Sequence, residues 1–137
     1  MTALLLALAC SSKLPTTTLV IDGHSVSAEL AASDADRQQG LMFRDSLGTD
    51  AGMLFAYPDT KVRGFWMKDT RIPLSIAFAD AEGVIVRIAH MKPMDETRTS
   101  SLYPAKYALE MEKGWFAKKG ITKGATIEGI PEDLDPK

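Results

Sequence analysis

The sequence predicts a mainly β domain with short helices (α+β), arranged as an antiparallel β-sandwich or a partly closed barrel. Roughly six or seven short apolar or alternating segments are separated by Gly, Pro and Asp turn signals. Two short segments have helical character, and both lie between candidate strands at hairpin spacing. Because parallel strands need long crossover connections, a series of parallel βαβ units is not expected. We expect one domain over residues 19–130.

The first predicted element is a β-hairpin. Residues 19–21 are apolar, and Val26, Ala28 and Leu30 alternate with polar residues on the other side of Asp22-Gly23. Alternating runs around an Asp-Gly pair are a strong hairpin signal. Ser33 then has the character of a helix N-cap, which predicts a short helix over about 34–41 with Gly40 near its end.

The middle of the chain predicts four strands. Residues 52–57 are apolar on both faces, and Pro58 is expected to end this strand. Residues 62–67 form the second strand. Residues 74–78 and 84–88 alternate and are joined by the turn 80–83, which predicts an antiparallel hairpin.

The last third begins with a segment that has no periodicity. Residues 90–104 contain two prolines and are expected to form a long loop, a type of segment that is often functional. A half-buried strand is predicted over 106–112, one helical turn over 114–119 that stops at Gly120, and a last strand over 125–130. The acidic tail 131–137 is expected to be disordered.

The amino terminus predicts export. Residues 4–9 are apolar and end at Cys10, the single cysteine, with Ala9 before it and small polar residues after it. This pattern is typical of a lipoprotein signal over residues 1–10, with lipidation at Cys10 and a tether over 11–18. The predicted location is therefore the cell envelope or periplasm. The alternative is a frayed apolar terminus on a cytoplasmic protein, since no basic residue precedes the run.

Composition narrows the classes of partner and cofactor. Sixteen Lys and Arg residues against 18 Asp and Glu give a formal net charge of −2, without the basic excess that nucleic-acid binding domains show. A single cysteine cannot form an internal disulfide. We find no phosphate cradle and no paired metal histidines, so we expect no cofactor, no nucleic acid, and membrane contact only through the lipid anchor. The oligomeric state stays open.

The chain resembles family 192 of the bacterial and archaeal domains of unknown function over roughly residues 37–130. The segments that carry the resemblance are 37–44 (RQQGLMFR), 52–55 (GMLF), 65–70 (FWMKDT), 72–74 (IPL), 108–110 (ALE) and the glycines at 114, 120 and 124. The resemblance implies a small, mostly β domain, often exported or lipid-anchored, and it implies no known reaction. Ser75 and Ala125 stand where family sequences usually have Asp.

Polar residues within these segments form the first candidate site: Arg44, Trp66, Lys68, Thr70 and Glu110. Cationic groups at one mouth would favour a carboxylate or phosphate, and a tryptophan would suit a sugar ring or a planar group. The expected function is non-enzymatic binding of a small molecule, a polymer or an envelope protein. The structural alternative is that Arg44 and Glu110 form an ion pair and Trp66 belongs to the core.

Two other classes of function stay open. His90, Met91 and Met94 could bind copper in an exported protein, because thioethers and imidazole suit Cu(I). A hydrolase could use Ser75 or the serines at 100 and 101, with His24 or His90 as base. No nucleophile-elbow spacing surrounds these serines.

Overall fold

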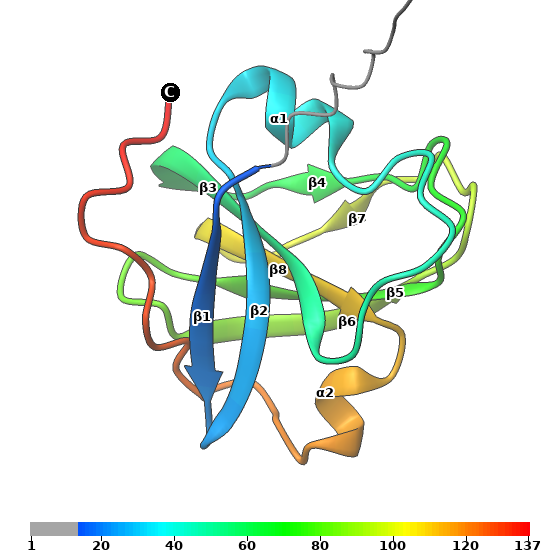
Figure 1. The fold of residues 1–137 in the computed structure, drawn as a ribbon. Coiled ribbons are helices and arrows are strands. Elements are labelled where there is room, and N and C mark those ends of the chain that lie inside the picture. Colours follow the sequence, from blue (N-terminus) through cyan, green and yellow to red (C-terminus); the bar gives the residue numbers. More distant parts are fainter. Residues whose placement is uncertain (1–13) are drawn as a thin grey trace, which may run out of the picture.

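The computed structural model describes residues 14–137, so the predicted signal segment, with Cys10, and residues 11–13 of the predicted tether lie outside the described residues. Residues 16–18, which were expected to belong to the tether, form the start of the first strand. Within this range the protein is mostly β with two short helices, and the strands form a strongly twisted six-stranded sheet beside a small two-stranded ribbon (Figure 1). The sheet does not close into a barrel. The predicted fold class is confirmed, in its sandwich-like form.

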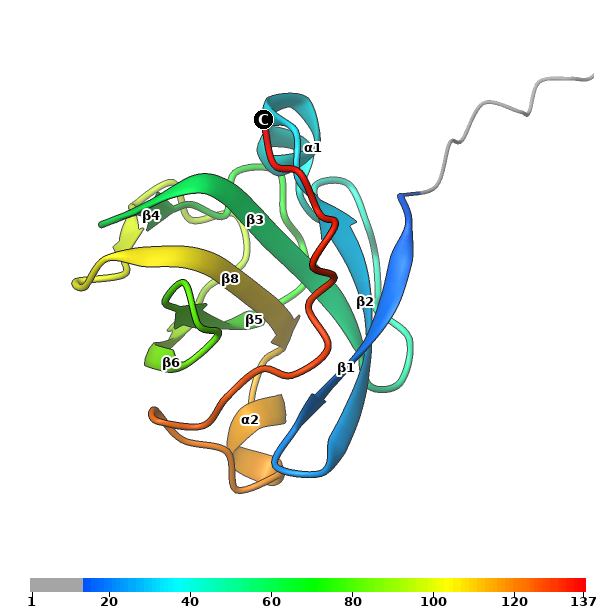
Figure 2. The same cartoon turned by 90° about the vertical axis from the view of Figure 1, so that its left-hand side faces the viewer.

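The six-stranded sheet has the order β1-β2-β3-β8-β5-β6. Its strands are β1 (Thr16–Ile21), β2 (His24–Ala31), β3 (Ala51–Lys61), β5 (Leu74–Ala79), β6 (Ile85–Met91) and β8 (Ala105–Glu112). The ribbon pairs β4 (Gly64–Phe65) with β7 (Thr99–Ser100). The helices are α1 (Asp34–Gln39) and α2 (Trp115–Lys118), which lie at opposite ends of the molecule (Figures 1 and 2).

Local signals gave several of these elements correctly. The β1–β2 hairpin turns at Asp22-Gly23, where Gly23 has φ of +80°. The Ser33 side chain accepts a hydrogen bond from the Asp36 amide and so caps α1, which ends at Gly40. The β5–β6 hairpin is antiparallel, as its alternating pattern predicts.

The sheet is mainly antiparallel, as predicted, but one pair of neighbouring strands is parallel. Strands β2 and β3 pair in parallel, with Leu30 opposite Leu54, and the chain crosses between them through α1 and the segment 40–50. This crossover is long enough for a parallel connection, although its helix is short. All other neighbouring strands of the two sheets pair antiparallel.

Strand boundaries also differ from the sequence expectation. Strand β3 continues through Pro58 to Lys61, because the register shifts between Ala56 and Lys61 and the proline lies in this irregular stretch. Only residues 64–65 of the predicted strand 62–67 are extended and paired. The predicted loop 90–104 contains the end of β6 and all of β7, so it is less irregular than its composition indicates.

The carboxyl-terminal segment is held by isolated contacts. In place of the predicted strand 125–130, single bridges join Val20 to Glu128 and Val84 to Thr126. The tail was expected to be disordered. The structure instead gives it specific contacts at α1, where the Lys137 amide donates to the Ala32 carbonyl. No helix among residues 14–137 is long and apolar enough to cross a membrane.

Apolar side chains fill both faces of the six-stranded sheet. Residues alternate along β8, so Leu109 and Met111 belong to one cluster with α2, while Ala108 belongs to the cluster below α1 and β4. Glu110 lies on the second face with Ala108. It is the one charged residue of β8 that is buried on a core face, and this position defines the candidate site.

Candidate functional site

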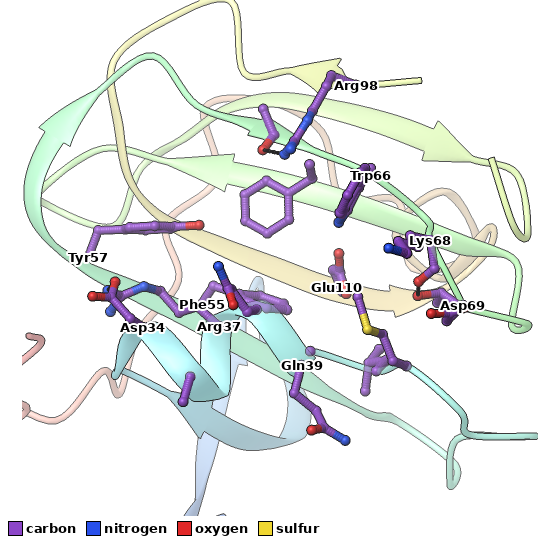
Figure 3. A pocket seen from close by; sticks show the side chains of 18 residues that line it. Asp34, Arg37, Gln39, Phe55, Tyr57, Trp66, Lys68, Asp69, Arg98 and Glu110 are labelled. Carbon is purple, nitrogen blue, oxygen red and sulfur yellow. Dashed lines mark hydrogen bonds and ion pairs between the residues drawn. The ribbon is translucent and has the colours of Figure 1, made fainter. Parts of the chain in front are cut away.

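A cavity of about 630 Å³ lies on the face of the sheet that carries α1 and β4 (Figure 3). Its walls come from α1 and the turn after it, from β3 and β4, and from the segment 66–70. Arg98, the residue that precedes β7, lies at the mouth of the cavity, and Glu110 lies at its base. The lining therefore brings together segments that are far apart in the sequence.

The Glu110 carboxyl is buried in an apolar environment. Its cross-strand neighbours are Met53 on β3 and Ile76 on β5, and both are fully buried. Glu110 itself is 4% exposed. Among residues 14–137, no hydrogen bond or ion pair reaches its carboxylate, and Figure 3 shows the group directed into the cavity. Burial without a compensating partner raises the pKa of Glu110 from 4.5 to about 8.

Two glycines allow the chain to pass close to this group. A Cβ atom at Gly52 would lie 2.2 Å from the Glu110 carbonyl oxygen, so strand β3 can approach β8 there only without a side chain. Gly40 ends α1 with φ of +48°, and a Cβ there would lie 3.3 Å from the Phe55 ring. Gly52 therefore permits the pairing of β3 with β8, and Gly40 lets the end of α1 pack on Phe55 in the cavity wall.

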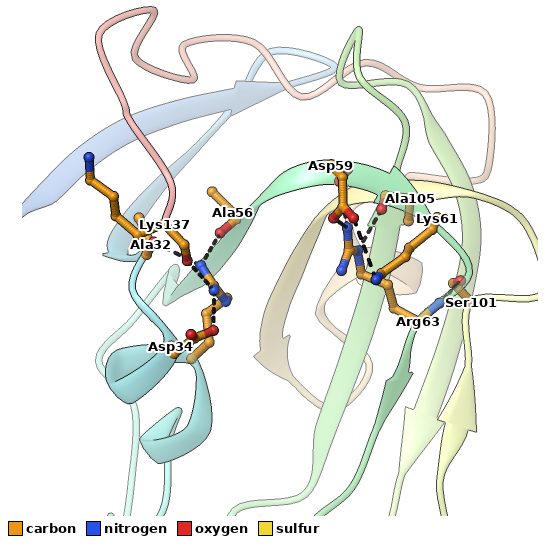
Figure 4. Close-up of polar contacts among 10 residues, drawn as sticks. Ala32, Asp34, Ala56, Asp59, Lys61, Arg63, Ser101, Ala105 and Lys137 are labelled. Carbon is orange, nitrogen blue, oxygen red and sulfur yellow. Dashed lines mark hydrogen bonds and ion pairs between the residues drawn. The ribbon is translucent and has the colours of Figure 1, made fainter.

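Arg37 fixes α1 against the sheet, and Figure 4 labels its partners Ala32, Asp34, Ala56 and Lys137. Its guanidinium donates to the carbonyls of Ala32 (2.8 Å) and Ala56 (2.9 Å), and also to the Asp34 carboxylate and the Lys137 carbonyl. Its side chain is 7% exposed. Because four of its five N–H donors are occupied by these partners, Arg37 holds the α1 wall in position.

Tyr57 forms one side of the cavity and is held by two arginines. The Arg37 guanidinium carbon lies 4.7 Å from the ring centroid, and that of Arg63 lies 3.6 Å away. Arg63 is itself fixed by the Ala105 carbonyl (2.7 Å) and the Asp59 carboxylate (Figure 4). Desolvation raises the pKa of Tyr57, so its hydroxyl stays a neutral donor and acceptor.

Two cations at the mouth of the cavity are not occupied in this way. The Lys68 ammonium lies 5.4 Å from the Trp66 ring centroid, and the Arg98 guanidinium carbon lies 4.4 Å from it. Both residues are exposed, and neither belongs to an ion pair within residues 14–137. Arg98 makes one long hydrogen bond, to the Gly64 carbonyl at 3.4 Å. Their charges remain available to a ligand.

The structure brings four of the five candidate residues to this cavity: Trp66, Lys68, Thr70 and Glu110. Thr70 is buried, and its hydroxyl donates to the Lys68 carbonyl (2.9 Å), so it shapes the turn that carries Lys68. Arg44 does not line the cavity. It pairs with Glu29 through two hydrogen bonds, and the alternative Arg44–Glu110 ion pair is not formed.

Sequence reasoning missed Tyr57, Arg37 and Arg98 as parts of the site. Arg37 lies in a segment that carries the family resemblance, but its role in holding α1 depends on carbonyl groups of β3 and of the tail, which are distant in the sequence. Arg98 lies in the segment that has no periodicity, so no pattern marked it. The contact between a cation and an aromatic ring is visible only once the two segments are packed together.

The copper candidates are not brought together. His90 and Met91 are neighbours on β6 and therefore point to opposite faces. Met91 is packed in the core, whereas His90 and Met94 are exposed. No group of three or more His, Cys, Asp or Glu side chains in the described chain could share a metal ion.

Ser75 and His90 do lie within hydrogen-bond reach, with 2.8 Å between the serine Oγ and the histidine Nδ1. Ser75 is fully buried, however, and its Oγ also accepts a hydrogen bond from the Gly114 amide (2.9 Å). A nucleophile must reach its substrate. The geometry instead links the β5–β6 hairpin to the start of α2. Ser101, also fully buried, accepts from the Arg63 amide and donates to the Tyr103 carbonyl.

Comparison with known protein families decides the relationship. The model of the DUF192 family, described as an uncharacterized ACR, matches residues 17–129. The chain belongs to the DUF192 family. This confirms the resemblance seen in the sequence, and it assigns no reaction.

Two solved structures are similar to this DUF192 chain over most of its length. One, from Sinorhizobium meliloti 1021, is described as a candidate transcription regulator; it is 31% identical, with a TM-score of 0.82 over 87% of this chain and 97% of that one. The other is a protein of unknown function from Novosphingobium aromaticivorans DSM 12444. It is 35% identical, with a TM-score of 0.79 over 89% of this chain and 91% of that one. No curated protein matches the chain.

The site geometry explains several landmarks of the DUF192 resemblance. Arg37 and Gly40 place the α1 wall, Gly52 permits the close approach of β3 to β8, and Glu110 lies at the cavity base. Trp66 and Lys68 come from the third landmark segment and lie at the mouth. The quoted landmarks therefore include the parts that build this cavity.

Proposed function

We propose that this DUF192 protein is a non-enzymatic binding domain whose ligand enters the cavity above Glu110. The observation that carries the proposal is a carboxyl group that faces a cavity and has no protein partner among residues 14–137. Every fully buried side-chain oxygen of the described chain has a hydrogen-bond partner, so the Glu110 oxygens are reached from the cavity. Polar groups in such a desolvated position normally have partners, and one without a partner costs free energy. A ligand group at this position would supply the missing partner.

The dimensions and lining of the cavity support a small molecule or the end of a polymer. A volume of about 630 Å³ lies within the usual range for ligand sites. Aromatic side chains supply apolar contact area, and a small number of charged groups can fix the orientation of a ligand. The described lining contains no Ser, Cys or His, so it offers no serine or cysteine nucleophile with a histidine base.

The proposal also includes export and a lipid anchor at Cys10, and its support is the amino-terminal sequence alone. Mass spectrometry of native protein from the membrane fraction is expected to show an amino-terminal Cys10 that carries lipid. Recovery of an intact, unmodified Met1 from the soluble fraction would overturn the envelope part of the proposal. It would leave the cavity proposal unchanged.

Binding can be tested with a panel of amino acids, ω-amino acids, uronic acids, neutral sugars and short peptides. Thermal shift identifies the probes that stabilise the protein, since a ligand at about a hundredfold excess over its Kd adds about 2.7 kcal/mol. Amide NMR shifts then locate the bound probe. We expect shifts around Trp66 and Glu110, present in Tyr103→Ala and lost in Trp66→Ala. Tyr103 is the matched control because it is an exposed aromatic residue outside this cavity.

Two outcomes would contradict the cavity proposal. The first is that no member of the panel changes the melting temperature or the amide spectrum. The second is that every active probe shifts residues away from the cavity and binds Trp66→Ala as well as wild type.

A further inference from the structure

We propose that the cavity selects a zwitterion, whose protonated amine pairs with Glu110 and whose anionic group is held by Lys68 and Arg98. This inference rests on the proposed binding function and specifies its ligand class. It follows from the way in which charges of opposite sign are separated inside one cavity (Figure 3).

No cation forms an ion pair with Glu110 within residues 14–137. Arg37 also lines the cavity, but four of its N–H donors are bound to Ala32, Ala56, Asp34 and Lys137. A metal ion would need further ligands, and residues 14–137 contain no cluster of three His, Cys, Asp or Glu side chains. A primary ammonium needs only hydrogen-bond acceptors, and charge-assisted hydrogen bonds to a carboxylate are stronger than neutral ones.

The mouth of the cavity carries positive charge. Lys68 and Arg98 both contact Trp66, and neither has a carboxylate partner in the described chain. Of the two other acids in the lining, Asp34 is paired with Arg37, and Asp69 lies on the far side of Lys68 from Trp66 in Figure 3. A carboxylate or phosphate at this mouth would be bound by two cations.

The rest of the lining is largely aromatic and apolar. Phe55, Tyr57 and Phe65 line the cavity, and the Phe65 ring contacts each of the other two edge to face. This part of the cavity fits a methylene chain or a ring and offers few partners to a body rich in hydroxyl groups. An amine and an acid joined by an apolar spacer match all three regions.

The protonation state of Glu110 makes the contact between its carboxylate and the ligand ammonium testable. Because burial raises the pKa of Glu110 to about 8, the free protein holds this group largely neutral at pH 7, and an ammonium must displace its proton. The apparent affinity should therefore rise about 50-fold between pH 6 and pH 8. The amine stays charged over this range, since its pKa is about 10.4. A neutral hydroxyl ligand bound to protonated Glu110 would give the opposite trend.

Other charged groups line the cavity with Glu110. Helix α1 contributes Asp34 and Arg37, the segment 66–70 contributes Lys68 and Asp69, and Arg98 precedes β7. The phenol of Tyr57 on β3 titrates above the range from pH 6 to pH 8, because desolvation raises its pKa. Strand β5 presents the apolar Ile76 at this position.

The experiment is calorimetric titration of the full chain with 4-aminobutanoate, 6-aminohexanoate, 8-aminooctanoate and 4-(aminomethyl)benzoate. Matched probes lack one end: hexanoate and 4-methylbenzoate lack the amine, and hexylamine and benzylamine lack the acid. We expect at least one zwitterion to bind about tenfold more tightly than both of its truncated partners. The affinity of this zwitterion should rise about 50-fold between pH 6 and pH 8.

Variants at the base and at the mouth of the cavity test the two contacts separately. Glu110→Gln should remove the pH dependence and reduce the zwitterion to the affinity of its amine-free partner, whereas Glu112→Gln on the exposed end of β8 should change neither. Lys68→Ala combined with Arg98→Ala should reduce the zwitterion to the affinity of its acid-free partner, with the exposed Lys92→Ala as control.

The inference is wrong if the zwitterions bind no better than their truncated partners. It is also wrong if none of them binds while another member of the wider panel does, in which case the cavity proposal stands. If no member of either panel binds at the cavity, both proposals fail.

Discussion

Leu109 and Glu110 are neighbours on β8, yet they face two differently built sides of the same sheet. On the Leu109 side, the closed face, Leu109 packs with Trp115, Phe116 and Ile121 in a continuous apolar cluster, and a cavity of about 460 Å³ beside Phe116 and Ile121 does not reach Leu109. On the Glu110 side, the open face, the cavity reaches the sheet itself, and the acid at its base has no partner among residues 14–137. One face is packed as a core, and the other keeps a polar group in an unfavourable environment.

This difference indicates a division of roles between the faces. Folding stability is a small difference between large terms, so an unpaired buried acid is tolerated only where other packing compensates for it. The closed face supplies such packing at α2 and the β1–β2 hairpin. The open face can then hold Glu110 ready for a ligand.

The largest expected effect is the pH dependence caused by Glu110. Its pKa is about 8 in the folded protein and 4.5 when unperturbed, so its contribution to stability is fully present below pH 4.5 and is lost as the pH rises through 8. The loss is on the order of 5 kcal/mol across this range. Glu110→Gln should remove it, which urea unfolding between pH 5 and pH 9 would measure.

Glu112→Gln provides the control on the same strand, because Glu112 is exposed. Equal pH slopes in wild type and Glu110→Gln would show that the carboxyl is not held in an apolar environment. The contrast between the two faces would then disappear.

Leu109→Ala tests the closed face. Leu109 is fully buried, and its truncation should destabilise the domain by about 2–5 kcal/mol, since the packed cluster can collapse only partly into the space. Leu102→Ala, at a leucine that is 59% exposed, should change stability by less than about 0.5 kcal/mol. A loss below about 1 kcal/mol for Leu109→Ala would mean that this face is not the main source of stability.

The arginines of the open face provide a third test. Arg37→Ala removes hydrogen bonds to the Ala32 and Ala56 carbonyls and should destabilise by about 2–3 kcal/mol. Arg98→Ala should change stability by less than about 0.5 kcal/mol, because this side chain is exposed and has no ion pair in the described chain. Similar losses in thermal unfolding would contradict the distinction between a positioning arginine and a free one.

Sequence patterns predicted the parts of this molecule that depend on near neighbours. The Asp22-Gly23 turn, the Ser33 cap and the β5–β6 hairpin are each encoded within a few residues. The parallel β2–β3 pair was not predicted, because the choice of a parallel neighbour depends on the path of the chain through α1. The continuation of β3 past Pro58 likewise depends on its register with β8.

The residues of the candidate site were likewise predicted only in part. Trp66, Lys68, Thr70 and Glu110 came from landmark segments, and the structure places them at one cavity. Arg44 was grouped with them because it is a cation in a landmark segment, but the cross-chain partner that it meets is Glu29. Arg98 joins the site only because β7 pairs with β4 and brings the preceding residue to Trp66.

The smallest expected effect concerns the cap of α1. Ser33 accepts a hydrogen bond from the Asp36 amide at 3.1 Å, whereas α2 begins at Gly114 without a side-chain cap. Ser33→Ala should therefore cost about 1 kcal/mol. The loss should appear locally as faster hydrogen exchange at the Arg37 and Gly40 amides, which are bonded within α1 and its cap.

Because α1 forms a wall of the cavity, loosening it should also weaken zwitterion binding by a few fold without changing its pH dependence. Ser27→Ala, at an exposed serine on β2, is the control and should alter neither property. If Ser33→Ala left both exchange and binding unchanged, the position of α1 would be set by Arg37 alone. The open face would then depend on its tertiary contacts and not on the local stability of its helix.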